Sequence, residues 1–238
     1  MALPTVSVDV AARRAALSRS TLFLVLQPAE IDAVLAQTTV KRVARSELIL
    51  RRGDGSSGAH IIVAGRVRVG TISEDGREVM LGVLGPGDVI GEMSVLDGED
   101  VSADVTALED CVLLFLERAR FLRLLRADAD LCLRLMAVLC RRLRRSNATL
   151  EEMALLDLGA RLARLLLRLA GDYGAPTARG TRIEVKLSQK DFGTLVGSSR
   201  EKVNIKLREW EEAGVLGKDA GRLVLLRPDV LAAASSPS

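Results

Sequence analysis

The sequence has few aromatic residues, one histidine and three cysteines. Phe, Trp and Tyr make up 3% of the 238 residues and hydrophobic residues as a whole 48%, so we expect an aliphatic core built largely from Leu, Val and Ala. Cys111, Cys132 and Cys140 lack metal-ligand spacing and a pairing pattern for disulfides, and they are too few for a four-thiolate iron–sulfur cluster. His60 stands alone, which argues against a His-rich metal site or a Ser–His–Asp triad. We therefore expect no metal, haem or iron–sulfur cluster.

Long hydrophobic runs are also absent. No segment approaches the roughly 20 apolar residues of a membrane-spanning helix. The apolar run at residues 22–26 is too short for the core of a signal peptide, and Arg19 interrupts the approach to it. We therefore expect a cytoplasmic protein with reduced thiols and without a membrane partner.

The charges are distributed unevenly along the chain. The formal net charge is +3, and from Asp157 onward there are 14 Lys or Arg against 10 Asp or Glu, compared with 20 against 21 before it. A basic C-terminal third beside a near-neutral remainder predicts a polyanionic partner for that third.

The first half of the chain has the pattern of a β-rich domain. We expect residues 1–20 to be a loosely ordered lead-in, followed by a short helix near residues 28–37. Within residues 47–117, short apolar runs alternate with turn chemistry such as the Gly-Pro-Gly-Asp of residues 85–88. Many short strands at such close spacing indicate a sandwich or jelly-roll barrel.

The pattern changes from β-rich to helical at residue 118. A short helix through residue 126 leads to Asp128 as an N-cap and then to a long helix at residues 128–156. Along it, residues recur in alternating steps of four and three, with Ser146 as the one polar member: Cys132, Met136, Leu139, Leu143, Ser146, Leu150 and Met153. One interpretation is that this stripe packs on its own β-domain. The other, which we favour, is a parallel coiled coil across a homodimer, because the spacing persists for three heptads.

The C-terminal third combines helices with short strands. We expect an amphipathic helix at residues 157–169, a loop at 171–180 and a strand at 183–187. A hairpin wing at residues 215–226 is expected near the end of the chain.

Between that strand and the wing, the sequence predicts a helix–turn–helix. Ser188 caps a helix that Gly197 ends, and Ser199 caps a second helix that ends at Gly214. Apolar residues of both helices can form one shared core: Phe192, Leu195, Val196, Val203, Leu207 and Trp210.

Such a unit places its second helix in the major groove, with the N-terminal residues against base edges. Arg can bond guanine bidentately, Glu can accept from a cytosine amine, and Lys or Ser can hold phosphates. The DNA contacts are therefore expected from Ser188, Lys190, Ser199, Arg200, Glu201, Lys202, Asn204 and Lys206. A charged helix pair is by itself usually a solvated surface; the spacing of caps and turn, the basic end and the hairpin together favour DNA binding.

The run Lys-Leu-Ser at residues 186–188 and the motif Val-Gly-Ser-Ser-Arg-Glu-Lys-Val at residues 196–203 are specific. With the glycine-punctuated β-roll and the long helix, they resemble the CRP/FNR family of bacterial transcription regulators over about residues 20–228. The resemblance implies an α+β fold, with a cyclic-nucleotide-binding-like β-roll (jelly roll) at residues 1–127, a dimerisation helix at 128–156 and a winged helix-turn-helix domain at 157–238. It also implies a homodimer on palindromic double-stranded promoter DNA, with RNA polymerase as a partner.

The same resemblance assigns roles within the second helix. Arg200 and Glu201 match the family's base-reading residues. Ile205 stands where the family has a further base-contacting Arg, so the preferred DNA site is left open.

The β-roll resembles a nucleotide pocket with one serious departure. Gly91 and Glu92 match a ribose-binding corner, and residues 101–103 match an Arg-Ser-Ala phosphate element in which Val101 replaces the Arg. Residues 79–116 contain eight acids and no Lys or Arg, a field that opposes an anion, although backbone amides at a helix N-terminus could still receive a phosphate. The candidate effector-binding residues are Gly91, Glu92, Met93, Ser102, Ala103, Ser146 and Asn147.

The effector therefore stays open between a cyclic nucleotide, another small molecule and none, and we expect operator binding without cyclic AMP. Two other classes of function fit the sequence less well than a DNA-binding regulator does. A pure ligand-binding module has no use for the helix–turn–helix. An enzyme on a cupin-like roll needs clustered His ligands, and His60 stands alone; no phosphate-loop or nucleophile-elbow pattern is present.

Overall fold

The computed structural model describes residues 9–20, 22–23, 26–73, 76 and 78–236 of the chain. The chain divides into two compact units, each described here by itself. The first comprises the chain up to Leu143 except residues 77–80, and the second comprises residues 77–80 and 144–238. The first eight residues of the expected lead-in, and part of the apolar run at residues 22–26, lie outside the described residues.

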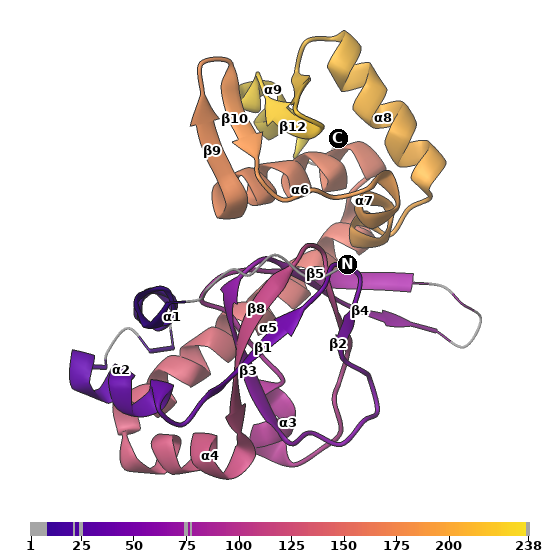
Figure 1. The fold of residues 1–238 in the computed structure, drawn as a ribbon. Coiled ribbons are helices and arrows are strands. Elements are labelled where there is room, and N and C mark those ends of the chain that lie inside the picture. The colour runs from indigo at the N-terminus through magenta and orange to yellow at the C-terminus, as the bar shows by residue number, and fades with distance from the viewer. Residues whose placement is uncertain (1–8, 21, 24–25, 74–75, 77, 237–238) are drawn as a thin grey trace. The chain divides into compact units, whose positions relative to one another are not determined.

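Two four-stranded sheets form the centre of the first unit (Figure 1). One has the strand order β1-β8-β3-β6 and the other β2-β7-β4-β5. Their bounds are β1 Thr39–Val43, β2 Leu48–Leu50, β3 Gly58–Ala64, β4 Val67–Ile72, β5 Glu78–Leu84, β6 Val89–Ile90, β7 Asp104–Ala107 and β8 Cys111–Glu117. The predicted β-roll is confirmed, and its first strand lies outside the β-rich range that the pattern indicated.

The core of the β-roll is aliphatic, as expected. Cys111 and Leu113 of β8 join a cluster with residues of both sheets, whereas Val112, Leu114 and Leu116 join a second cluster with residues of the flanking helices. Successive side chains of a strand point to opposite faces. The β1-β8-β3-β6 sheet is therefore covered on both faces, which explains the continuous apolar run of β8.

Four helices accompany these sheets: α1 Val10–Arg19, α2 Pro28–Leu35, α3 Glu92–Asp97 and α4 Arg118–Ala127. The expectation of a loosely ordered lead-in is wrong for its described part. Ala16 and Leu17 of α1 are fully buried in the core, and Arg14 donates from Nε to Asp32 of α2 over 3.0 Å. Ala16 and Leu17 are the buried residues that dock α1 on the core.

The long helix α5 runs from Ala129 to Leu155. Asp128 Oδ1 accepts hydrogen bonds from the backbone nitrogens of Asp130 and Leu131 at 2.9 and 3.1 Å, which confirms the predicted N-cap.

The predicted stripe of α5 is divided between two environments. Cys132 and Leu139 pack against the core of the β-roll. Met136, Leu143 and Leu150 are exposed. Packing on the chain's own β-domain therefore accounts for only part of the stripe.

The second unit contains a four-stranded sheet of order β11-β12-β10-β9 and four further helices (Figure 1). Their bounds are α6 Leu158–Tyr173, β9 Gly174–Thr177, β10 Gly180–Ile183, α7 Gln189–Val196, α8 Arg200–Glu212, β11 Leu216–Asp219, β12 Arg222–Leu225 and α9 Pro228–Ala234. Asp157 caps α6 by accepting from the backbone nitrogen of Ala160 at 2.8 Å.

Two expectations for this unit are wrong. Residues 171–180 are not a loop, because α6 continues to Tyr173 and β9 follows at once. Pro176 is tolerated in β9 since that strand lies at the edge of the sheet. The strand expected at residues 183–187 lies earlier, as β10, although Ile183 and Val185 are buried as the alternation predicted.

Within the described part of the chain, no helix combines the length and the apolar character needed to cross a membrane. The same residues contain no group of three or more His, Cys, Asp or Glu side chains suited to a metal ion.

Candidate nucleic-acid interface and sensor corner

The helix–turn–helix is held by the caps that its sequence predicts. Ser188 Oγ accepts from the backbone nitrogen of Asp191 at 3.1 Å, and Asp191 Oδ2 accepts in return from the Ser188 nitrogen at 2.7 Å. Ser199 Oγ accepts from the Lys202 nitrogen at 3.3 Å. Gly197 adopts the left-handed conformation between the helices, with φ of 63°.

The two helices share the expected apolar core. Phe192 and Val196 of α7 and Val203, Leu207 and Trp210 of α8 are all buried, while Leu195 is half-buried. Gly193 brings the turn close, because a Cβ there would lie 2.8 Å from the Ser198 carbonyl oxygen. The buried stripe of α8 thus fixes which face of the helix is available to DNA.

The predicted base-reading residues are at the exposed start of α8. Arg200, Glu201 and Lys202 are exposed. Hydrogen bonds to Glu201 from its own backbone N–H and from the Ser199 hydroxyl hold the pKa of its carboxyl below the usual range. Glu201 is therefore ionised at neutral pH and is suited to accept from a base amine.

Three predicted DNA contacts outside the helix caps have partners inside the protein, and one of them is Lys190, whose Nζ pairs with Glu78 at 2.8 Å. Asn204 Oδ1 accepts from Gln189 Nε2 at 2.6 Å, which links α8 to α7. Lys206 Nζ pairs with Glu209 at 2.9 Å and lies 5.4 Å from the centre of the Trp210 ring. Lys202 is consequently better placed than Lys190 or Lys206 to hold a phosphate. Ser188 is exposed as the N-cap of α7.

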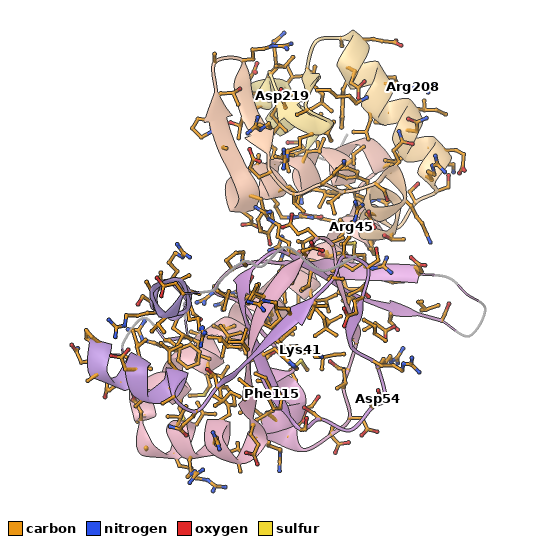
Figure 2. All side chains as sticks on the ribbon, viewed as in Figure 1. Lys41, Arg45, Asp54, Phe115, Arg208 and Asp219 are labelled. Carbon is orange, nitrogen blue, oxygen red and sulfur yellow. The ribbon has the colours of Figure 1, made fainter. Side chains whose placement is uncertain are left out.

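The wing is a tight hairpin anchored by ion pairs. Strands β11 and β12 pair antiparallel from Leu216↔Leu225 to Asp219↔Arg222, and Ala220 and Gly221 turn the chain with positive φ. Asp219, labelled in Figure 2, accepts from Arg182 Nη1 of β10 at 2.6 Å. The wing is therefore tied to the centre of its sheet.

The sensor corner lies where β6 ends and α3 begins. Gly91 adopts a left-handed conformation with φ of 77° as the N-cap of α3, and Glu92 is 2% exposed. The buried Glu92 Oε1 accepts from Arg142 Nη1 of α5, and Arg142 Nη2 donates to the Val89 carbonyl oxygen at 2.6 Å. A buried carboxylate needs such a partner, because desolvation disfavours its charge.

Val101 occupies the position at which the family's phosphate-binding Arg-Ser-Ala element has its Arg, so the side chain there is apolar. Val101 is buried, and its backbone nitrogen donates to the Asp54 carbonyl oxygen at 2.9 Å. Ser102 is exposed, with its Oγ 3.9 Å from Met93 Sδ, and Ala103 is buried. Val101 gives an anionic phosphate no charged partner.

Ser146 and Asn147 are both exposed, on the part of α5 that belongs to the second unit.

Arg142 is not among the site residues predicted from the sequence. Its only sequence signal is the basic run of α5, with Arg at 141, 142, 144 and 145, beside a corner whose own segment lacks cations.

Two family models match this architecture. The cyclic nucleotide-binding domain matches residues 40–128, and the Crp-like helix-turn-helix domain matches residues 160–234. The CRP-like cAMP-activated global transcriptional regulator of Mycobacterium tuberculosis is 30% identical over 210 residues, which cover 88% of this chain and 93% of that protein. The chain belongs to the CRP/FNR family of transcription regulators.

Other relatives agree with this family. The Cyclic AMP receptor protein of Thermus thermophilus is 32% identical over 197 residues, covering 83% of this chain and 88% of that protein. The structure of CLP from Xanthomonas campestris, described as a c-di-GMP responsive global regulator, has a TM-score of 0.71 at 25% identity and covers 84% of this chain and 99% of that one. The chain is thus a DNA-binding regulator with a sensor domain, and neither an enzyme nor a ligand-binding module alone.

Proposed function

We propose that this CRP/FNR protein acts as a homodimer that reads a palindromic promoter site with α8 in the major groove, with RNA polymerase as its partner there. The observation that carries the proposal is the capped, exposed start of α8, where Arg200 and Glu201 can contact base edges. The basic balance of the C-terminal third supports the attraction to a polyanion.

The dimer is supported by the exposed apolar part of α5. Met136, Leu143 and Leu150 are spaced by seven residues, and each is more than half exposed in the single chain. Seven-residue spacing keeps one stripe toward a partner helix. Reading two half-sites a helical turn apart also requires two copies of α8.

We further propose that the dimer binds its operator without cyclic AMP. Val101 supplies no charge to a phosphate, and the acids of residues 79–116 oppose one. The alternative is control by a cyclic nucleotide, which the family's domain description and the effectors named for its relatives favour.

The test starts with selection of a binding site from random double-stranded DNA in the absence of nucleotides. Fluorescence anisotropy then gives the Kd of the selected site and of a scrambled one, each with and without cyclic AMP, cyclic GMP and cyclic di-GMP. We expect specific binding that none of the three changes, and no heat of binding in calorimetric titrations. Micromolar binding of cyclic AMP together with nucleotide-dependent DNA binding would contradict effector independence, and equal affinity for both DNAs would contradict specific recognition.

A further inference from the structure

One aliphatic side chain lies at the centre of the exposed face of α8. Val203, Leu207 and Trp210 form its buried stripe. At about 100° per residue, Ile205 projects roughly opposite to that stripe. It is 59% exposed, and it follows Glu201 by four residues, which places the two side chains on one face.

The other exposed side chains of α8 are all charged. The other exposed residues of α8 are Arg200, Glu201, Lys202, Arg208, Glu209 and Glu212, of which Arg208 is labelled in Figure 2. The side chains on either side of Ile205 are engaged within the protein, Asn204 with Gln189 and Lys206 with Glu209. In the second turn of the helix, Ile205 is therefore the side chain that projects outward without a role in the fold.

We infer that Ile205 reads the C5-methyl group of a thymine in each half-site, which rests on the proposed binding of α8 in the major groove. An aliphatic side chain forms no hydrogen bond with a base edge. The apolar feature that the major groove offers it is the thymine methyl group. A β-branched side chain on a helix also has one strongly preferred rotamer, so little side-chain entropy is lost when it packs against the methyl group.

This contact complements the polar ones in the first turn. Arg200 and Glu201 are suited to guanine and cytosine. Ile205, one turn further along the helix, adds selectivity for an A·T pair, in the strand orientation that presents the methyl group to it. A polar side chain at this position would read a different base.

The test changes the DNA rather than the protein. Each thymine of the selected site is replaced in turn by deoxyuridine, which removes only the methyl group, and Kd is measured by fluorescence anisotropy for the wild type and for Ile205→Ala. We expect one thymine per half-site at which this replacement weakens wild-type binding about fourfold, the effect of one buried methyl-sized group. Ile205→Ala should bind the thymine and deoxyuridine sites equally well.

Lys202→Ala is the matched control on the same exposed face. It should bind both DNAs more weakly and keep the full preference for thymine. If no thymine distinguishes the wild type from Ile205→Ala while both still prefer the selected site to a scrambled one, the inference about Ile205 is wrong and the proposed function stands. If neither protein prefers the selected site, the proposed function itself is wrong.

Discussion

Arg200 and Lys202 are close together at the start of α8, but they are expected to contribute differently to DNA binding. Both are exposed. Arg has a planar fork that can bond guanine bidentately, whereas Lys is a point charge suited to phosphate. The two side chains therefore allow base reading and charge attraction to be measured separately.

Arg200→Ala should cost about 1–3 kcal/mol on the selected site and relax the preference at one base pair. Lys202→Ala should weaken the selected and the random DNA about equally and lower the slope of log Kd against log salt by about one. Anisotropy titrations at several salt concentrations measure both effects. Equal weakening of the two DNAs by Arg200→Ala would contradict its base-reading role.

His60 is a buried titratable residue of β3, paired across the strands with Ile90 of β6. Its ring lies 5.0 Å from the ring of Phe115, and its Nδ1 has no hydrogen-bond partner among the described residues. Burial, assisted by the charge of Lys41, lowers the pKa of His60 to about 4; Figure 2 labels Lys41 and Phe115. The neutral ring is therefore the form that fits the fold.

This lowered pKa predicts a loss of stability in acid. The folded state binds the His60 proton less readily than the unfolded state, whose pKa is about 6.5, so stability is lost as the pH falls from about 6.5 toward 4. The full loss is about 3 kcal/mol. Urea unfolding at pH 7.5 and 4.5 should show a larger drop for the wild type than for His60→Gln. An equal drop in the free energy of unfolding of both proteins would contradict the role given to His60.

At the scale of elements, the first part of α5 packs against the β-roll, and a later part of the helix has exposed apolar side chains. Leu131 and Leu135 are buried in the core of the first unit. Leu143, by contrast, is 62% exposed. A change at Leu143 should therefore affect association more than folding.

Leu143→Glu should convert the dimer into monomers. An unpaired charge buried between two helices costs several kcal/mol, since desolvation is not repaid by a partner. Sedimentation velocity measures the oligomeric state, and circular dichroism should show unchanged helix content. Leu155→Glu is a control, because Leu155 is exposed at the last residue of α5 and is outside the predicted stripe. A Leu143→Glu protein that sediments as a dimer would contradict the proposed dimer contact through the stripe of α5.

At the scale of the whole molecule, the β-roll and the helix–turn–helix are two parts of one regulator, and a ligand in the first could change DNA binding by the second. In the resemblance to a nucleotide corner, Glu92 and Ser102 match polar positions, and Val101 stands where the motif has a charged Arg. The corner is therefore either intact apart from one residue or rebuilt around Arg142.

Val101→Arg distinguishes these two states. It should create cyclic AMP binding if the rest of the corner is intact, because it adds a charge-assisted contact to the phosphate. Calorimetric titration of the variant and of Val101→Leu, its apolar control, measures this directly. Binding by the Arg variant alone indicates an otherwise intact corner, whereas no binding by either indicates a rebuilt one. Equal cyclic AMP binding by both variants would contradict the role given to the missing charge.

Local signals along the chain determined much of this protein. Side-chain oxygens of Asp128, Asp157, Ser188 and Ser199 cap the helices that follow them, and Gly197 ends α7. A cap needs only a residue type three or so positions from the amide it serves, so the sequence alone predicts it. The helix–turn–helix and its base-reading end were predictable for this reason.

Tertiary structure decided what depends on distant partners. Arg142 reaches Glu92 across 50 positions of sequence, and nothing local to either residue indicates the pair. The strand β9 forms because β10 offers it an edge to pair with, although its Gly and Pro residues suggested a loop. The core docking of α1 and the division of the α5 stripe likewise follow from which faces the β-roll covers. Pairing and burial belong to surfaces built from remote segments, and only the folded chain brings those segments together.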